Sequence, residues 1–179
     1  MLRTAFQVIC FAGLFVVVGV LAYRLSGAGD FDPGDTATAA ATQNRPHYPS
    51  HWLTDWSAAA TAAQAEHKPI LAEFQGSDWC IWCKHFHREI VDTPEFQAWA
   101  GKNVVLLDVD FPQDPPLPQA RQDANNALAQ RFKVDEFPTL LLLTPDGKEL
   151  ARMGYVQGGP KAWLPHAEAM VAGYQPQTK

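Results

Sequence analysis

Two cysteines separated by two residues are the side chains in this sequence whose spacing best suits redox chemistry. Cys80 and Cys83 enclose Ile81-Trp82, follow an apolar run at 70–74 and begin a segment with helical periodicity. At the N-terminus of a helix, free backbone N–H groups and the positive end of the helix dipole stabilise a thiolate. Because a thiolate is the species that attacks a disulfide, the pattern favours thiol–disulfide exchange. Cys80 is then the attacking thiol, and Cys83, one turn inward, resolves the mixed disulfide.

Other roles for the cysteine pair stay open at this point. A structural disulfide across so short a span would remove little entropy from the unfolded chain. A zinc site normally has four ligands, and the sequence holds no second pair of cysteines. His85 and His87 lie close to the pair, so a metal site of two cysteines and a histidine, a copper site included, is one alternative. Two plain buried cysteines are another.

The residues around the cysteines resemble a known active site. Trp79 before the pair and Lys84 after it complete a Trp-Cys-x-x-Cys-Lys pattern that resembles the active site of the thioredoxin superfamily. The Gly-Ser-Asp-Trp-Cys form at 76–80 is similar to that of exported bacterial thioredoxin-like proteins. Phe137-Pro138-Thr139, which opens a later predicted strand, is similar to the superfamily's cis-proline loop. The resemblance covers about residues 52–172.

This resemblance implies a role for each matching residue. Cys80 would be the nucleophile and Cys83 the resolving thiol. Pro138 would be cis and pack against the disulfide, and the backbone of Phe137 would pair with a substrate peptide. Trp79 would shield one side of the cysteine pair. The implied reaction is an exchange between sulfur atoms, for which we expect no bound cofactor and no metal ion.

The sequence departs from the superfamily pattern at the buried acid that accepts the proton of the inner thiol. That acid usually precedes the first cysteine by six residues, where this sequence has Phe74. Glu73 lies seven residues before Cys80, and one extra residue within 76–78 would restore the alignment. Glu73 is therefore the candidate proton acceptor for Cys83, and an ordinary glutamate at a strand edge is the alternative. The pair Ile81-Trp82 also differs from the superfamily's Gly-Pro and Pro-His pairs, which tune the reduction potential.

Neighbouring polar and aromatic residues receive simpler interpretations. His85 and His87 are predicted on or near the exposed face of the active-site helix, with His87 one turn from the inner cysteine and placed to tune it. Trp52 and Trp56 are predicted to pack in the core and not to form an aromatic ligand-binding site. Asp78, next to the site, would influence which substrate charges are preferred.

Alternating helices and strands must position the cysteine pair. A helix is predicted at 57–67, with Thr54 or Asp55 as its cap, and a second is predicted to start within 80–83 and run to about 91. A helical turn restarts at 93–95, with Thr93 as the cap and Pro94 at the first helical position, and further helices are predicted at 119–132 and after Gly159-Pro160. Strands are predicted at 70–74, 104–109, 139–144 and 149–155, with an Asp-Gly turn at 145–148 and a proline-rich loop at 111–118. This alternation predicts parallel strands, and the Asp-Gly turn adds one antiparallel pair. The expected fold is α/β and thioredoxin-like, with a mixed central sheet and helices on both faces.

The N-terminal part differs in composition from this domain. Residues 5–23 carry no charge and, as a helix, would extend about 28 Å, close to the thickness of the hydrocarbon core of a bilayer. We expect a transmembrane signal anchor at 1–25, with a signal peptide cleaved near Ser26-Gly27-Ala28 as the alternative. Residues 26–50, rich in Gly, Pro, Ala, Thr and Ser, are expected to be a flexible linker. The domain is expected at 51–174 and a tail at 175–179.

Charge narrows the classes of function. The sequence has 19 acidic and 14 basic residues, a net charge of −5, which argues against a broad nucleic-acid-binding face. Residues 1–24 contain two arginines and no acids, so the remainder has 12 basic and 19 acidic residues and a net charge of −7. Cys10 lies in the apolar segment, which leaves Cys80 and Cys83 as the cysteines of the domain.

Together these features predict a membrane-tethered thiol–disulfide oxidoreductase of the reductase or isomerase type. Its domain would face the periplasm or an equivalent exported space. Its partners would be protein thiols and disulfides and a membrane or periplasmic electron donor, because an oxidising compartment would otherwise leave the cysteine pair oxidised. The alternatives are a metal-binding or metal-delivery protein and a non-catalytic thioredoxin-fold interaction module.

Overall fold

The computed structural model describes residues 51–176. The predicted anchor at 1–25, the predicted linker at 26–50 and residues 177–179 lie outside the described residues. Between residues 51 and 176, no helix is both long enough and apolar enough to cross a membrane.

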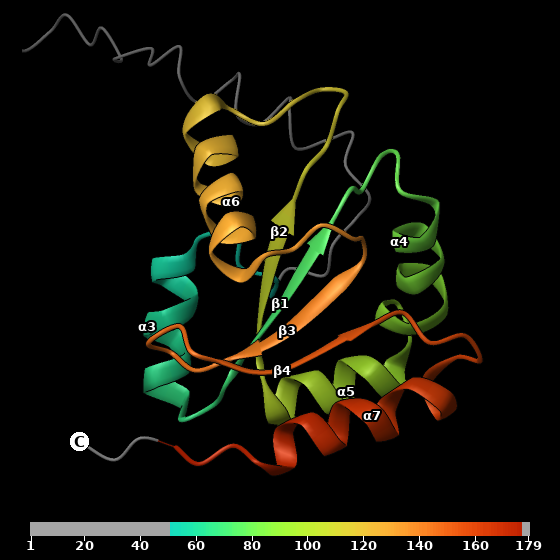
Figure 1. Ribbon diagram of the computed structural model, residues 1–179. Helices are drawn as coiled ribbons and strands as arrows, with labels where there is room; N and C mark the ends of the chain where they lie inside the picture. The colour runs from blue at the N-terminus through green and yellow to red at the C-terminus, as the bar shows by residue number, and fades with distance from the viewer. Residues whose placement is uncertain (1–50, 177–179) are drawn as a thin grey trace, which may run out of the picture. The chain divides into compact units, whose positions relative to one another are not determined.

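A mixed sheet of four strands forms the centre of the described domain (Figure 1). The strands are β1 (Ile70–Gln75), β2 (Val105–Asp110), β3 (Thr139–Leu143) and β4 (Glu149–Gly154), in the order β2-β1-β3-β4. Strand β1 is parallel to β2 and antiparallel to β3, and β4 is antiparallel to β3. The predicted mixed sheet is thus confirmed.

The direction of β3 corrects the prediction of a single antiparallel pair. Thr139, the first residue of β3, pairs with Phe74 near the end of β1, and Leu143 pairs with Ile70 at its start. Residues 133–138 therefore bring the chain back to the carboxyl end of β1 before β3 begins. The alternation of helices and strands could not reveal that return, because it takes place within a loop.

Helices cover both faces of the sheet, as predicted. Their bounds are α3 (Trp56–Glu66), α4 (Ile81–Phe86), the π-helix η1 (His87–Val91), α5 (Pro94–Asn103), α6 (Gln119–Phe132) and α7 (Pro160–Ala172). Alternate residues of each strand face opposite sides. Leu71, Leu106 and Leu140 pack with η1, α5 and α7, whereas Ile70, Leu107 and Leu141 pack with α3 and α6. Strands β1, β2 and β3 are buried along their whole length for this reason.

Local signals fix the start of two helices. The backbone N–H of Ala58 donates to Asp55 Oδ1 at 2.9 Å, so Asp55 is the cap of α3. Thr93 caps α5 and Pro94 occupies its first turn, as predicted. Trp52 lies in the core and stacks on Phe96 with 6.5 Å between ring centroids, which confirms its packing role.

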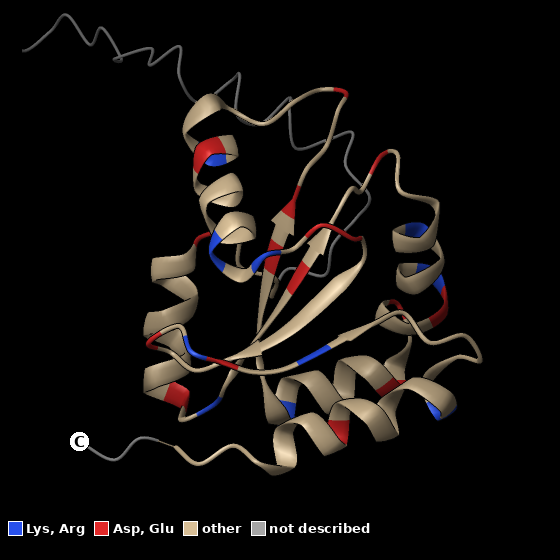
Figure 2. Cartoon of the chain, in the orientation of Figure 1, with Lys and Arg blue, Asp and Glu red and all other residues tan. Residues whose placement is uncertain are grey.

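Charged positions also occur inside the sheet. Figure 2 shows acidic positions within the arrows of β1 and β2, and these are Glu73, Asp108 and Asp110. All three side chains are buried. Burial of a carboxylate is costly unless partners compensate it, so these acids mark the part of the fold where polar contacts must be concentrated.

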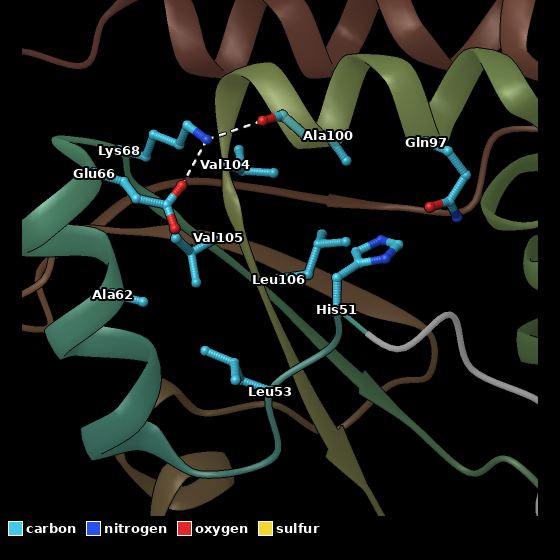
Figure 3. Close-up of a pocket in the computed structure, with 11 residues that line it drawn as sticks. His51, Leu53, Ala62, Glu66, Lys68, Gln97, Ala100, Val104, Val105 and Leu106 are labelled. Atoms are coloured by element: carbon cyan, nitrogen blue, oxygen red, sulfur yellow. Dashed lines mark hydrogen bonds and ion pairs between the residues drawn. The ribbon is translucent and has the colours of Figure 1, made fainter.

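A pocket opens at the amino-terminal ends of β1 and β2 (Figure 3). Its polar lining is largely paired internally, because Lys68 Nζ contacts Glu66 Oε2 at 2.7 Å and the carbonyl oxygen of Gly101 at 2.9 Å. The cysteine pair follows the opposite, carboxyl end of β1. The pocket is therefore separate from the redox chemistry.

Candidate active site

The cysteine pair forms a disulfide at the start of α4. Cys80 and Cys83 are joined with 5.3 Å between their Cα atoms. Cys80 is the N-cap residue, and its Sγ accepts a hydrogen bond from the backbone N–H of Cys83 at 3.1 Å. Cys80 keeps 6% of its surface exposed, whereas Cys83 is fully buried. The two cysteines therefore differ in exposure, and of the pair only Cys80 keeps any contact with solvent.

The predicted helix at 80–91 is present but changes type along its length. Residues of α4 are α-helical, and the chain continues into the π-helix η1 without a break. The backbone N–H of Asp92 donates to the carbonyl oxygen of His87 at 2.9 Å, which closes the wider turn. Such π-helical turns occur frequently at functional sites.

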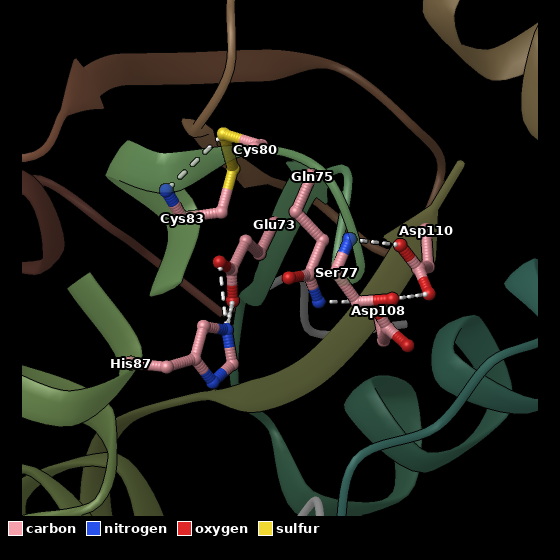
Figure 4. Close-up of polar contacts among 8 residues, drawn as sticks. All are labelled: Glu73, Gln75, Ser77, Cys80, Cys83, His87, Asp108 and Asp110. Carbon is pink, nitrogen blue, oxygen red and sulfur yellow. Dashed lines mark hydrogen bonds and ion pairs between the residues drawn. A yellow bond between two sulfur atoms is a disulfide. The ribbon is translucent and has the colours of Figure 1, made fainter. Parts of the chain in front are cut away.

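Glu73 lies under this helix and is completely buried. It belongs to β1, which has a hydrogen-bonded neighbour on each side, so the alternative of a strand-edge glutamate is wrong. Both carboxylate oxygens approach His87 Nε2, Oε1 at 2.9 Å and Oε2 at 3.0 Å. Figure 4 shows Glu73 between the cysteine pair and His87.

His87 corrects the prediction of an exposed histidine. Its side chain is only 14% exposed. Residues four apart share one face of a helix, and His87 follows the buried Cys83 by four, so this spacing was a signal for an inward position. Burial opposes protonation of His87, but attraction to the Glu73 carboxylate and the hydrogen bond between them outweigh it and raise the pKa of His87.

Two further buried acids stand beside Glu73 on the neighbouring strand, where the sequence was interpreted as apolar. Asp108 pairs in register with Glu73, and Asp110 pairs with Gln75. Gln75 Nε2 donates to Asp108 Oδ1 at 2.8 Å. Burial, followed by the negative charge of Asp110, raises the pKa of Asp108 to about 7. The detectable signal was two aspartates two residues apart in an apolar strand, because that spacing puts both on one face.

Asp110 fixes the loop that leads to the cysteines. Its Oδ1 accepts from the backbone N–H of Ser77 at 2.9 Å, and its Oδ2 accepts from the Ser77 hydroxyl at 2.6 Å. The side-chain amide of Asn125 donates to the Asp110 carbonyl oxygen at 2.8 Å. The end of β2 therefore determines where the Gly-Ser-Asp-Trp loop begins.

Apolar side chains surround the disulfide on the surface. Trp79, Ile81 and Trp82 are 43%, 58% and 51% exposed, respectively. The ring of Trp79 meets that of Phe137 edge to face at 5.7 Å. The peptide bond between Phe137 and Pro138 is cis, as the resemblance implied. Exposed apolar side chains thus flank the cysteines at 79–82, and the Trp79 ring connects them to Phe137, the residue before the cis proline.

Asp78 contacts the proline-rich loop that follows β2, and its predicted influence on substrate charge stays a prediction. Its Oδ2 accepts from the backbone N–H groups of Gln113 at 2.9 Å and Asp114 at 2.8 Å. Although burial favours the neutral acid, these hydrogen bonds outweigh it and lower the pKa of Asp78. The carboxylate is therefore engaged in holding the 111–118 loop next to the cysteines.

The alternative of a metal site finds no support in residues 51–176. In that range, no three or more His, Cys, Asp and Glu side chains are grouped so that they could hold a metal ion. His85 Nδ1 lies 3.4 Å from Glu89 Oε1, and His87 contacts Glu73. Both histidines are thus paired with acids instead of the cysteines.

Comparison with known proteins agrees with this geometry. A family model described as a thioredoxin-like domain matches residues 56–168. The disulfide bond reductase DsbH of Chlamydia pneumoniae is 38% identical over 112 residues, which cover 61% of this chain and 68% of that protein. The thioredoxin-related protein DsbJ of the same organism is 29% identical over 117 residues, 65% of this chain and 34% of that protein.

A solved structure described as DsbH oxidoreductase is also similar. It superposes with a TM-score of 0.64 and 33% identity, covering 74% of this chain and 92% of that one. The 56–168 range matched by the family model contains the four strands and the cysteine pair. The chain belongs to the family of proteins with a thioredoxin-like domain.

Proposed function

We propose that this protein is a thiol–disulfide oxidoreductase that works as a disulfide reductase on exported proteins. The observation that carries the proposal is the Cys80–Cys83 disulfide at the N-terminus of α4, in which Cys80 keeps some exposed surface and Cys83 keeps none. The similarity to a disulfide bond reductase supports the reductive direction.

The order of the two reaction steps follows from the different exposure of the two cysteines. In the reduced protein, the Cys80 thiolate attacks a substrate disulfide, forms a mixed disulfide and releases one substrate thiolate. Cys83 then loses its proton and attacks the Cys80 sulfur, which releases the second substrate thiolate and forms the Cys80–Cys83 disulfide. Two electrons pass from the protein to the substrate, and a donor dithiol must restore the reduced pair.

Glu73 is the proposed acceptor of the Cys83 proton. A thiol buried as deeply as Cys83 ionises with difficulty because burial disfavours the charged form. Glu73 is buried on the same side of the sheet as α4 and carries the acceptor oxygens that such a step requires. Its position in Figure 4 supports this role.

Substrates are proposed to bind across the apolar surface around Cys80. Trp79, Phe137 and Pro138 would contact the peptide that carries the disulfide, with the Phe137 backbone pairing to it. Exposed tryptophans are suited to this, because large aromatic side chains bury much apolar area on binding. Such a surface favours unfolded or misoxidised proteins over folded ones.

Residues 5–23 are proposed to anchor the protein in the membrane, and residues 26–50 to act as the linker that leaves the 51–174 domain free to turn. The domain would face the periplasm or an equivalent exported space, where a membrane or periplasmic donor would reduce it. Fractionation and protease protection in intact cells test this arrangement, and a soluble mature protein that begins near Ala28 would replace the anchor with a cleaved signal.

The function is tested by trapping and by the reduction potential, with the full chain in detergent. Cys83→Ala should accumulate mixed disulfides with substrate proteins, whereas Cys80→Ala should accumulate almost none and Cys10→Ala should behave as the parent. Equilibration with glutathione should give a potential closer to about −270 mV, typical of reducing family members, than to about −120 mV, typical of oxidants. Trapping by Cys80→Ala instead would reverse the assigned roles.

A further inference from the structure

An unusual concentration of negative charge lies beneath the disulfide. Glu73, Asp108 and Asp110 occupy one face of two adjacent strands, and their exposed fractions are 0%, 5% and 2%. Glu73 and Asp108 are direct neighbours in the register. Two carboxylates that share a buried site cannot both ionise easily, and one of them then retains its proton.

His87 supplies the compensating positive charge. Its Nε2 contacts both oxygens of Glu73, at 2.9 and 3.0 Å. The other charged groups that act on the imidazole are Asp92, at the end of η1, and Asp108, on β2, and both favour its protonated form. The rings of Trp52 and Phe86 lie 6.3 and 5.9 Å from it and limit access of water.

We propose that His87 is a positioning residue for the resolving step: its imidazolium keeps Glu73 in the carboxylate form that accepts the Cys83 proton at neutral pH. The inference rests on the proposed function and adds a second group to the proton transfer. When the mixed disulfide resolves, the Cys83 S–H bond breaks, its proton moves to a Glu73 oxygen, and the new thiolate displaces the substrate sulfur from Cys80. His87 keeps its own proton throughout.

Loss of the imidazolium would change the surroundings of Glu73. Without His87, Glu73 would be a fully buried side chain beside Asp108 with no countercharge, and burial disfavours the charged form of a carboxyl. A protonated Glu73 has no capacity for the Cys83 proton. The resolving step would then require a more alkaline solution, whereas the first attack by Cys80, which does not involve Glu73, would be unaffected.

The chain offers a matched control in His85. It lies on the same helical segment, two residues earlier, and also approaches a glutamate, with 3.4 Å between Nδ1 and Glu89 Oε1. That pair is partly exposed, with 32% and 36% of the two side chains accessible. Unlike the His87–Glu73 pair, it does not involve any of the three buried acids Glu73, Asp108 and Asp110. Loss of the His85 imidazole should therefore leave proton transfer from Cys83 unchanged.

The experiment uses the full chain with Cys10→Ala, reduced and then mixed with the aromatic disulfide probe 5,5′-dithiobis(2-nitrobenzoate). The first chromophore released reports attack by Cys80, and the second reports resolution by Cys83. His87→Gln should move the pH profile of the second release to higher pH, with a rate roughly tenfold lower near neutrality. The first release should not change.

Two further variants separate charge from structure. His85→Gln should match the parent in both phases. His87→Lys, which keeps a positive charge, should restore much of the second phase near neutrality. A His87→Gln profile that superimposes on the parent, in a variant that melts like the parent, would overturn the inference.

A second readout does not depend on turnover or on the folding of a His87 variant. In the parent, the His87 imidazole should titrate above the range of an ordinary histidine by nuclear magnetic resonance, and Glu73→Gln should return it toward that range. An imidazole that does not respond to Glu73→Gln would refute the charge coupling. If instead both phases behave as expected but the protein fails to reduce protein disulfides, the proposed function fails and the role of His87 stands.

Discussion

The indole N–H of Trp79 donates a hydrogen bond to the carbonyl oxygen of Phe111 at 2.8 Å. This bond joins the residue before Cys80 to the residue that follows β2. The Phe111 ring in turn lies 5.4 Å from that of Phe137, which precedes the cis proline. Three segments far apart in the sequence thus meet in one aromatic group beside the disulfide, and its geometry can be tested one contact at a time.

Gly76 is required for the position of Trp79. A Cβ at residue 76 would lie 2.3 Å from an atom of the Trp79 ring, closer than any real contact allows. Gly76→Ala should therefore displace the indole, break its hydrogen bond to Phe111 and cost about 1 kcal/mol of stability. Tryptophan fluorescence and chemical denaturation measure both effects.

Gly101 provides the control for that substitution. It lies in α5, and nothing approaches within 4 Å of the place where its Cβ would be. Gly101→Ala should stabilise the protein by about 0.5–1 kcal/mol, because alanine favours the helix. If Gly76→Ala and Gly101→Ala change the free energy of unfolding and the tryptophan fluorescence equally, the close approach of Trp79 to Gly76 has no consequence.

Asp78 should hold the 111–118 loop through its two backbone contacts. Asp78→Ala removes Oδ2, which accepts both hydrogen bonds, and is expected to cost about 1–2 kcal/mol, whereas Asp78→Asn keeps an acceptor oxygen and should cost less. Because the pKa of Asp78 is lowered in the folded state, its contribution is present above the pKa of the unfolded chain and is lost as the pH falls. Urea denaturation at pH 7 and pH 3 measures this, and an Asp78→Ala penalty that is the same at both values would contradict it.

Asp108 should make the protein less stable as the pH rises. In the unfolded chain an aspartate ionises near about pH 3.9, but burial raises the pKa of Asp108 to about 7 in the folded protein. Between these values the folded state binds more protons than the unfolded state, so stability falls with increasing pH. Asp108→Asn keeps the acceptor for Gln75 and should therefore gain, relative to the parent, on the order of a few kcal/mol between pH 4 and pH 8.

The control for Asp108 is Asp123, an exposed aspartate of α6 that accepts a hydrogen bond from Gln119 at 2.9 Å. Asp123→Asn should leave the pH dependence of unfolding unchanged. The free energy of unfolding of Asp108→Asn and of the parent is measured by denaturation from pH 4 to pH 8. A difference between them that stays constant over this range would show that Asp108 ionises without cost in the folded state.

Features encoded within a few residues could be predicted from the sequence. Asp55 and Thr93 cap their helices through side-chain contacts to residues three further on, and Pro94 occupies a first helical turn. The cysteine pair at a helix start is equally local. These signals sufficed for the helices, the strands and the reactive residues.

Features that depend on the meeting of distant segments could not be predicted in the same way. His87 points inward to a glutamate fourteen residues earlier, and Asp108 acquires its surroundings from the register with β1. The direction of β3 depends on the path of residues 133–138, which carry no periodic pattern. In each case the deciding feature joins segments that are distant in the sequence, so only the assembled fold shows it.

Trp82 should contribute to substrate binding without contributing much to stability. Its side chain is 51% exposed, and its ring lies 5.6 Å from that of His85 and 6.4 Å from that of Tyr155 at the surface. Trp82→Ala is therefore expected to change stability by less than about 1 kcal/mol. Loss of an aromatic contact worth roughly 1 kcal/mol should raise KM for reduction of an unfolded protein disulfide about fivefold.

The size of the substrate separates binding from chemistry in this test. A small aromatic disulfide needs little of the surface around Cys80, so its reduction by Trp82→Ala should proceed at nearly the parental rate. Leu150→Ala is the matched control, because Leu150 is another exposed apolar side chain, 37% accessible, but belongs to β4. If Trp82→Ala and Leu150→Ala have the same KM for the protein substrate, the exposed tryptophan takes no part in binding it.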